Sequence, residues 1–195
     1  MNATNDFTPE PGRSSLTLVL GGTRSGKSEL AEGIAARCGA RIAYVATAEV
    51  LPGSGSMEER VRRHRERRPS GWTTVEAPRN VADTVRASGA LEEADAVMLD
   101  CVTMLACNAL YANGQARSGE EFERVLKEEI DALAALVEES GKPWVLVSSE
   151  AGLGIVAADA ETRLFCDGLG LANQWLARHA NHVFMSVAGL PLRLK

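Results

Sequence analysis

The stretch Gly21-Gly22-Thr23-Arg24-Ser25-Gly26-Lys27-Ser28 lies between the apolar run Leu16–Leu20 (LTLVL) and a helical pattern that extends from Lys27 to Cys38. It matches G-x-x-x-x-G-K-[ST], and a strand before it and a helix after it are the context that this phosphate-binding motif requires. Glycines allow backbone N–H groups to turn inward around β- and γ-phosphates, and the helix N-terminus adds partial positive charge. Lys27 can neutralise phosphate charge, and the Ser28 hydroxyl can ligate Mg²⁺. These residues predict a nucleotide-binding loop.

The rest of the chain alternates short apolar runs with helical patterns. Strands are predicted at Leu16–Leu20, Ile42–Ala46, Trp72–Glu76, Ala96–Asp100, Trp144–Ser149 and, as the last strand, His182–Val187. Helices are predicted at Lys27–Cys38, Met57–Arg68, Thr103–Asn113, Glu120–Glu139 and from Asp159 to Ala180. Apolar strands separated by helices indicate a mainly parallel sheet that is covered on both faces. We therefore predict an α/β, three-layer P-loop fold with a mainly parallel central sheet.

Length and composition indicate one domain. The 195 residues fit a single catalytic domain at residues 15–195, preceded by a polar, disordered lead-in at residues 1–14. The net charge of −5 argues against a protein that coats polyanions, so no nucleic-acid partner is expected. No apolar run reaches the roughly 18 residues of a membrane span, and the N-terminus lacks the pattern of a signal peptide. The four cysteines form no C-x-x-C pair, so we expect free thiols, no structural zinc site and a cytoplasmic location.

Asp100 ends the apolar run Ala96–Asp100 (AVMLD), at the place where the acid of a nucleotide site reaches the metal. An acid at the end of a strand can also cap the following helix, so both roles are open for Asp100. The chain contains no N-K-x-D motif, and it therefore does not read guanine in the manner of Ras-like GTPases.

The stretch of residues 60–68 (RVRRHRERR) places six arginines around His64 on a predicted helix. A solvated basic face or a nucleic-acid patch would explain such a stretch, but the chain is acidic overall and the stretch has no aromatic side chains to stack on bases. Arginines beside a histidine would lower its pKa and keep the imidazole neutral and nucleophilic. The same guanidinium groups could hold a triphosphate and stabilise pyrophosphate as it leaves. His64 is therefore a candidate nucleophile.

Several motifs in order along the chain resemble one enzyme family. They are GGTRSGKS, YVATA, RVRRHRERRPSGW, LDCVT with Asn108, SEAGLGIV, the Asp167 to Asn173-Gln174 stretch and VAGLPLRLK. The resemblance extends from Leu16 to Lys195 and is to the bifunctional adenosylcobinamide kinase/adenosylcobinamide-phosphate guanylyltransferases of cobalamin biosynthesis. Its most specific element is the single histidine in an R-[IV]-x-x-H-x-x-x-R-P helix, because phosphate-binding loops alone are common.

The resemblance implies a RecA-like P-loop fold and a homo-oligomer, usually a trimer. It implies that ATP or GTP phosphorylates adenosylcobinamide, and that GMP then passes from GTP to adenosylcobinamide phosphate through a guanylylated His64. Mg²⁺ would act with the nucleotide. By resemblance, Leu20 through Lys27 hold the phosphates, and Ala46, Thr47 and Ala48 contact the nucleotide. The guanine-nucleotide site would be lined by Arg65, Glu66, Arg67, Arg68 and Glu76. Asp100 would be the nucleotide- or metal-binding acid.

The sequence departs from the family pattern in a few stretches outside the nucleotide motifs. The departures are Gly55, Ser56, Ser149, Ala151, Ala157 and Cys166. They are expected to affect corrinoid binding or the kinase step rather than guanylyl transfer. Glu150, at the end of a central strand, is a candidate for positioning the attacking hydroxyl. The alternatives are a plain small-molecule P-loop kinase without guanylyl transfer, and a nucleotide-dependent switch or ATPase that acts on a macromolecule.

Overall fold

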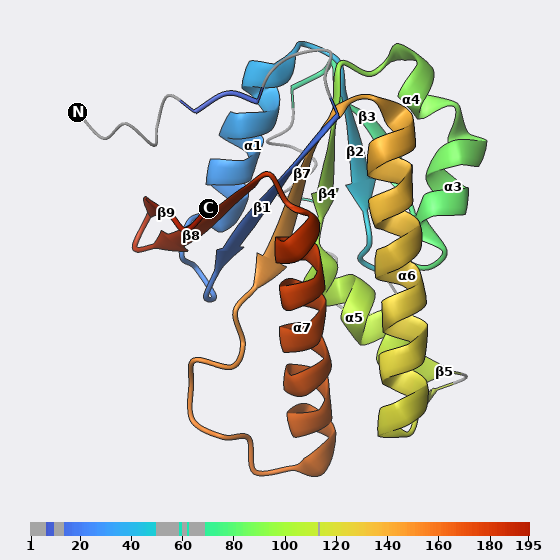
Figure 1. The fold of residues 1–195 in the computed structure, drawn as a ribbon, viewed down its shortest axis with the longest axis vertical. Helices are drawn as coiled ribbons and strands as arrows, with labels where there is room; N and C mark the ends of the chain where they lie inside the picture. The colour runs from blue at the N-terminus through green and yellow to red at the C-terminus, as the bar shows by residue number, and fades with distance from the viewer. Residues whose placement is uncertain (1–6, 10–13, 50–58, 60–61, 63–68, 113) are drawn as a thin grey trace.

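The computed structural model describes residues 7–9, 14–49, 59, 62, 69–112 and 114–195 (Figure 1). Its centre is a seven-stranded sheet with the order β3-β2-β4-β7-β1-β8-β9. The strands of this sheet are β1 (Ser15–Gly21), β2 (Ile42–Ala46), β3 (Thr73–Glu76), β4 (Ala96–Asp100), β7 (Pro143–Ser149), β8 (His182–Val187) and β9 (Leu190–Arg193). A separate two-stranded ribbon is formed by β5 (Tyr111–Ala112) and β6 (Gln115–Ala116).

The strand pairs confirm the predicted mainly parallel sheet. Strand β1 pairs in parallel with β7 on one side and with β8 on the other, and β4 pairs in parallel with β2 and β7. The exception is β9, which turns back from β8 as an antiparallel hairpin. The carboxyl ends of the parallel strands therefore meet at one edge of the sheet, which lies toward the bottom of Figure 1.

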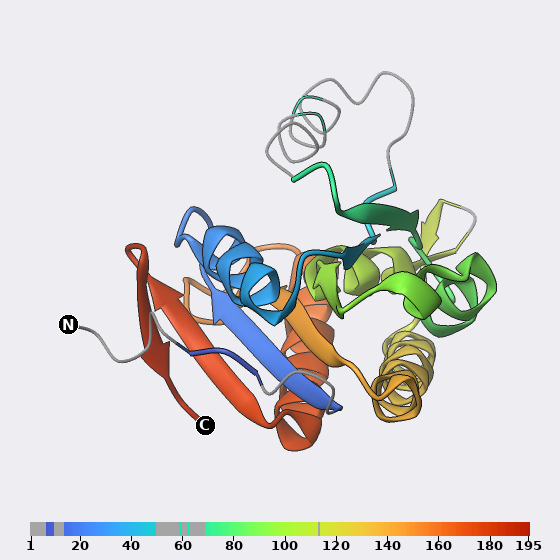
Figure 2. The same ribbon diagram turned by 90° about the horizontal axis from the view of Figure 1, so that it is seen from above.

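Helices cover both faces of the sheet, which confirms the three layers (Figure 2). One face carries α1 (Lys27–Cys38), which packs over β1, β4, β7 and β8. The other face carries α6 (Gly119–Ser140) and α7 (Ala160–His179), which pack against each other and against β1. In the described part of the chain there are also three shorter helices: α3 (Val81–Ser88), α4 (Ala90–Glu93) and α5 (Val102–Leu110).

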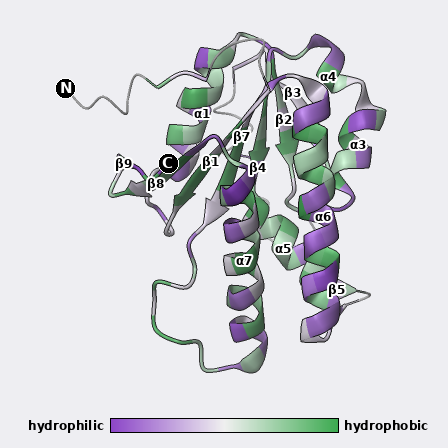
Figure 3. Ribbon diagram, in the orientation of Figure 1, coloured by the Kyte–Doolittle hydropathy of each residue, from purple (hydrophilic) through white to green (hydrophobic). Residues whose placement is uncertain are grey.

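The sequence pattern explains why these elements form. Strands β4 and β7 are buried along almost their whole length, as expected for strands covered on both faces. Helix α6 buries seven apolar side chains along one stripe, and Figure 3 shows its opposite face as hydrophilic. Its first turn is capped by Ser118, whose hydroxyl accepts from the backbone N–H of Glu121. Asp159 caps α7 in the same way, through the N–H of Thr162.

The structure differs from the predicted elements at three places. The helix expected to reach Asn113 ends at Leu110, because the chain pairs β5 with β6 and the N–H of Arg117 satisfies the Leu110 carbonyl. His182–Val187 is not the last strand, since β9 follows it. Helices α3 and α4 were not predicted. The predicted loop 50–56 and helix 57–68 lie outside the described residues, apart from Glu59 and Arg62, which are helical.

Part of the predicted lead-in lies on the edge of the sheet. The ring of Phe7 lies 4.4 Å from the imidazole of His182 and 5.2 Å from the ring of Phe184, measured between centroids. The Phe7 carbonyl accepts from Arg37 Nε at 3.0 Å. Phe7 is therefore packed against the protein, because its ring covers the apolar cluster that contains Phe184. Among the described helices, none has the length and apolar character needed to cross a membrane.

Candidate active site

The phosphate-binding loop connects β1 to α1 and has the strained backbone that its glycines allow. Strand β1 ends at Gly21 and α1 begins at Lys27. Gly26 has a φ of 88°, a conformation that L side chains rarely adopt. A Cβ on Gly21 would lie 2.4 Å from Ser25 Oγ and 2.8 Å from the Ser186 carbonyl oxygen, so no larger residue fits there without movement. The loop therefore forms a tight turn, and a larger side chain at Gly21 or Gly26 would prevent this conformation.

Lys27 is folded back over the loop. Its Nζ donates to the Gly22 carbonyl oxygen at 3.1 Å, and the Ser25 N–H donates to the same carbonyl at 3.3 Å. The hydroxyl of Ser25 is buried and has no hydrogen-bond partner among the described residues. A bound phosphate would supply stronger acceptors for the ammonium group than a neutral carbonyl does. The loop thus has the charge and the donors that a nucleotide phosphate requires.

Asp100 lies at the carboxyl end of β4, two strands away from the loop. Its Oδ2 accepts from the hydroxyl of Tyr44 at 2.7 Å, which fixes the direction of the carboxylate. Burial, as the larger cause, and the Asp100 carboxylate together raise the pKa of the adjacent Cys101 thiol to about 11, although its hydrogen bonds with Met104 and Thr103 and the Lys27 ammonium act in the opposite direction. The Cys101 thiol, just before α5, is therefore close enough to both Lys27 and Asp100 to be affected by their charges.

Thr47 ties the end of β2 to the end of β4. Its hydroxyl donates to the Cys101 carbonyl at 2.7 Å and accepts from the Cys101 N–H at 2.8 Å. The buried side-chain amide of Asn108, on α5, donates to the carbonyls of Thr47 at 2.8 Å and Pro78 at 2.7 Å. Buried polar groups that are fully paired in this way hold their surroundings in one arrangement. The segment after β2 is therefore held rigidly beside Asp100.

Glu150 follows β7 directly and lies beside the phosphate-binding loop. Its N–H donates to the Gly21 carbonyl at 3.2 Å. Its Oε2 accepts from the amide of Asn173, on α7, at 3.3 Å, and the same amide donates to the Ser149 carbonyl at 3.0 Å. The Asn173 oxygen in turn accepts from the Ser148 hydroxyl at 2.6 Å. This network holds the Glu150 carboxylate at the carboxyl edge of the sheet.

The structure brings most of the predicted nucleotide residues to one edge of the sheet. They come from the ends of four parallel strands: Leu20 and the loop Gly21–Ser28 after β1, Ala46, Thr47 and Ala48 at and after β2, Glu76 at the end of β3, and Asp100 at the end of β4. Ala46 and Glu76 are directly paired between β2 and β3. His64, Arg65, Glu66, Arg67 and Arg68 lie outside the described residues, so their predicted roles stay predictions.

Two residues that contact the loop were not predicted from the sequence. Ser186 on β8 is directly paired with Gly21 on β1, and Gly189 follows in the β8–β9 turn. Both donate to the Ser25 carbonyl oxygen. The sequence predicts β8 as a strand of a mainly parallel sheet but does not predict its pairing with β1, and nothing in the local sequence of β8 indicates a contact with the loop.

The residues at this edge fit a Mg²⁺ ion that arrives with a nucleotide. Within the described part of the chain, no group of three or more His, Cys, Asp or Glu side chains could hold a metal ion alone. Mg²⁺ bound to a nucleotide needs only one or two protein oxygens besides phosphates and water. The Ser28 hydroxyl and the Asp100 carboxylate are oxygen donors of this kind, and a carboxylate accepts more than the one hydrogen bond from Tyr44.

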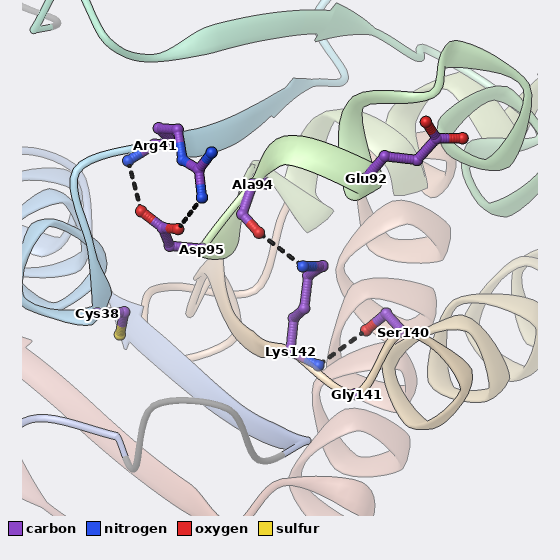
Figure 4. Close-up of a pocket in the computed structure, with 8 residues that line it drawn as sticks. All are labelled: Cys38, Arg41, Glu92, Ala94, Asp95, Ser140, Gly141 and Lys142. Atoms are coloured by element: carbon purple, nitrogen blue, oxygen red, sulfur yellow. Dashed lines mark hydrogen bonds and ion pairs between the residues drawn. The ribbon is translucent and has the colours of Figure 1, made fainter.

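A cavity of about 370 Å³ lies at the opposite, amino-terminal edge of the sheet (Figure 4). Three of its charged side chains already have partners: Arg41 Nη2 lies 2.8 Å from Asp95 Oδ1, and Lys142 Nζ donates to the Ala94 carbonyl at 2.6 Å. The Arg41 side chain and its backbone N–H, with that of Ala40, lower the pKa of Asp95 to about 2. These contacts join the starts of β2, β4 and β7 and have a structural role.

Comparison with known proteins identifies the family of this chain. Residues 17–194 match the family described as cobinamide kinase / cobinamide phosphate guanyltransferase. The chain is 39% identical to a bifunctional adenosylcobalamin biosynthesis protein of Pseudomonas aeruginosa, over 91% of this chain and 96% of the relative. It is 34% identical to proteins of the same description from Salmonella typhimurium and Escherichia coli, over 92% of this chain and 99% of each relative.

A solved structure of a KaiC-like protein from Pyrococcus horikoshii has a TM-score of 0.52 at 15% identity, over 89% of this chain and 71% of that chain. At this identity the likeness concerns the fold. The match of almost the whole sequence carries the assignment: the chain belongs to the cobinamide kinase / cobinamide phosphate guanyltransferase family.

Proposed function

We propose that this chain phosphorylates adenosylcobinamide with ATP or GTP and then transfers GMP from GTP to the product, giving adenosylcobinamide-GDP. The observation that carries the proposal is the carboxyl edge of the sheet, where the Gly21–Ser28 loop, Asp100 and Glu150 lie together in a chain of this family. Family membership supplies the corrinoid substrate, and the loop supplies the means of holding a nucleoside triphosphate.

In the kinase step the loop binds the β- and γ-phosphates through its backbone N–H groups. Lys27 leaves the Gly22 carbonyl and offsets the negative charge of the transferring phosphoryl group. Ser28 and Asp100 would hold Mg²⁺, which, when bound, supplies further charge neutralisation across the phosphates. Leu20 lies near the end of β1, Ala46 ends β2, and Thr47 and Ala48 follow it, and these positions support their predicted contacts with the nucleotide.

Glu150 is the proposed residue for orienting the hydroxyl of the acceptor. It lies next to the loop through its bond to Gly21, and Asn173 holds its carboxylate. A carboxylate at this place can accept the hydrogen bond of an attacking hydroxyl and direct its oxygen toward the γ-phosphorus. The hydroxyl oxygen forms the new bond to the γ-phosphorus, its proton passes to the Glu150 carboxylate, and the bond from the γ-phosphorus to the bridging β-phosphate oxygen breaks.

His64 is the proposed nucleophile of the guanylyl step. Support comes from the R-[IV]-x-x-H-x-x-x-R-P pattern, which this chain contains in full, and from the family. A ring nitrogen of His64 forms a bond to the α-phosphorus of GTP, and pyrophosphate leaves with the electrons of the broken P–O bond. A phosphate oxygen of the corrinoid then attacks the same phosphorus, and His64 leaves. Arg65, Glu66, Arg67, Arg68 and Glu76 are proposed to line this guanine-nucleotide site.

A homo-oligomer, with three subunits as the proposed number, agrees with an exposed apolar stripe on the edge strand. Leu190, Leu192 and Leu194 alternate along and after β9 and are 61%, 57% and 58% exposed. Leu192 is directly paired with Met185, whose side chain packs against the core on the α7 side, so the stripe lies on that face beyond α7. Apolar side chains on an edge strand favour pairing with another surface.

All four cysteines are free thiols, which supports the proposed location in the cytoplasm, where thiols stay reduced.

The function is tested by incubating the purified protein with adenosylcobinamide and separating the products by chromatography. With ATP alone we expect adenosylcobinamide phosphate, and with GTP we expect adenosylcobinamide-GDP and pyrophosphate. The absence of both products under either condition would overturn the proposed function. Formation of the phosphate alone in the presence of GTP would favour a plain kinase.

A further inference from the structure

The turn between β8 and β9 touches the phosphate-binding loop from the side. Figure 1 shows β8 next to β1, and the pairing places Ser186 opposite Gly21, the last residue of β1. The turn consists of Ala188 and Gly189, with φ angles of 51° and 78°. Positive φ at both central residues is the conformation of a tight two-residue hairpin turn. The turn is therefore well defined and not a loose loop end.

Both donors of this hairpin bind one acceptor in the loop. The Ser186 hydroxyl donates to the Ser25 carbonyl oxygen at 2.7 Å, and the Gly189 N–H donates to the same oxygen at 2.8 Å. Ser186 is 1% exposed, so water does not compete for this bond. The two backbones are also close, because a Cβ on Gly26 would lie 3.0 Å from Gly189 Cα. The contact thus depends on small residues and on two hydrogen bonds.

These bonds fix the direction of one peptide group in the phosphate-binding loop. The Ser25 carbonyl and the Gly26 N–H belong to one planar trans peptide, and in such a peptide the two groups point in opposite directions. Holding the carbonyl toward the hairpin therefore holds the Gly26 N–H away from it, toward the opposite side of the loop. Backbone N–H groups of this motif are the donors that cradle the phosphates. A donor fixed before binding costs less to order when the ligand arrives.

We infer that Ser186 and the Ala188–Gly189 turn position the Ser25–Gly26 peptide for binding nucleoside triphosphates. The inference rests on the proposed function insofar as the loop binds ATP and GTP. It gives the C-terminal hairpin a role in the kinase half-reaction, in which the loop holds the triphosphate. Ser186 is a positioning residue, because it acts through the peptide and has no proposed contact with the nucleotide.

The test replaces Ser186 with alanine, which removes one of the two donors. We expect binding of Mg-ATP, measured by titration calorimetry, to weaken about 3- to 10-fold, the loss typical of one hydrogen bond. The KM for ATP in the kinase reaction should rise to the same extent. The kcat at saturating ATP and the KM for adenosylcobinamide should stay within about 2-fold of the wild-type values, because the reacting groups are unchanged.

The matched control is Ser140→Ala, at the opposite edge of the sheet. The Ser140 hydroxyl donates to the Val137 carbonyl at 2.9 Å and accepts from Trp144 Nε1 at 2.9 Å. Its loss should lower the melting temperature without changing the affinity for ATP. If Ser186 has a purely structural role, Ser186→Ala should also lower the melting temperature without changing the affinity for ATP.

Three outcomes decide the inference. Weaker ATP binding in Ser186→Ala but not in Ser140→Ala supports it, whereas wild-type affinity in Ser186→Ala overturns it. If Ser186→Ala does not fold, Ser186→Cys keeps the size of the side chain and replaces the hydroxyl with a weak donor, and the same criteria apply. Failure of the wild-type protein to bind ATP would overturn the proposed function, and the inference with it.

Discussion

Lys27 is the residue whose charge the kinase reaction needs most directly. Its ammonium group bonds to a neutral carbonyl of its own loop, and a triphosphate offers it a charged partner. Lys27→Ala should lower kcat/KM for phosphorylation of adenosylcobinamide about 100-fold or more, the scale of losing one donor to a developing charge. The control is Lys142→Ala, which removes an ammonium group that bonds to Ala94 at the opposite edge. Near-normal phosphorylation by Lys27→Ala would contradict the assignment of the loop.

Asp95 is a residue at which pH should change stability. Its pKa is lowered from 3.8 to about 2 in the folded protein, chiefly by the Arg41 side chain. A carboxylate with a lowered pKa contributes stability above its unfolded pKa, and this contribution is lost as the pH falls through the folded pKa. We therefore expect Asp95 to contribute stability at pH 5 that is lost between about pH 4 and pH 2.

The measurement compares urea unfolding of the wild type and Asp95→Asn at pH 5 and at pH 2.5. The variant should be less stable at pH 5, and the difference between the two proteins should shrink at pH 2.5. A difference that is constant with pH would show that the ionised carboxylate is not what stabilises this edge of the sheet.

At the scale of elements, the β8–β9 hairpin has a residue that does not suit its conformation. Ala188 has a φ of 51°, where Asn is tolerated better and where Asn-Gly is the preferred pair of a two-residue turn. Ala188→Asn should stabilise the protein by about 0.5–1 kcal/mol and raise the melting temperature by about 1–4 °C. Ala188→Val should lower the melting temperature, because a β-branched residue fits this conformation poorly. Equal melting temperatures of all three proteins would contradict the observed turn.

The elements that the sequence predicted correctly are those with local signals. The Gly21–Ser28 loop has its own motif, and β1, β4 and β7 are continuous apolar runs. Helix α3 was missed because it is short and because the N–H of Asn80, just before it, is satisfied by the distant Glu129 carboxylate at 2.6 Å. Strand β9 contains Pro191, which weakens a strand pattern, and its edge position makes the proline acceptable.

The same reasoning applies to the site. Lys27, Ser28 and Asp100 could be predicted because each follows or ends a recognisable pattern. The bond from Ser186 to Ser25 joins residues 161 positions apart, and only the parallel pairing of β8 with β1 brings them together. Asn173 entered the prediction through the family resemblance, whereas its contact with Glu150 depends on how α7 lies against the end of β7.

At the scale of the whole molecule, the exposed stripe on β9 leads to a prediction about assembly. Replacing Leu190 and Leu192 by Lys should prevent apolar contact between subunits and shift the protein to a smaller species in sedimentation velocity. Glu123→Lys, on the exposed face of α6, is the control for added positive charge and should leave the assembly unchanged. If the double variant sediments like the wild type, β9 does not form the subunit contact.

The central claim is that one chain uses its phosphate-binding loop for γ-phosphoryl transfer and His64 for guanylyl transfer. The most direct measurement incubates the wild type, His64→Asn and Lys27→Ala with GTP that carries radioactive phosphorus at either the α- or the γ-position, and then isolates the protein. We expect an acid-labile adduct on the wild type with the α-label and not with the γ-label. His64→Asn should form no adduct and should still phosphorylate adenosylcobinamide with ATP. An α-labelled adduct on His64→Asn, or none on the wild type, would contradict the account.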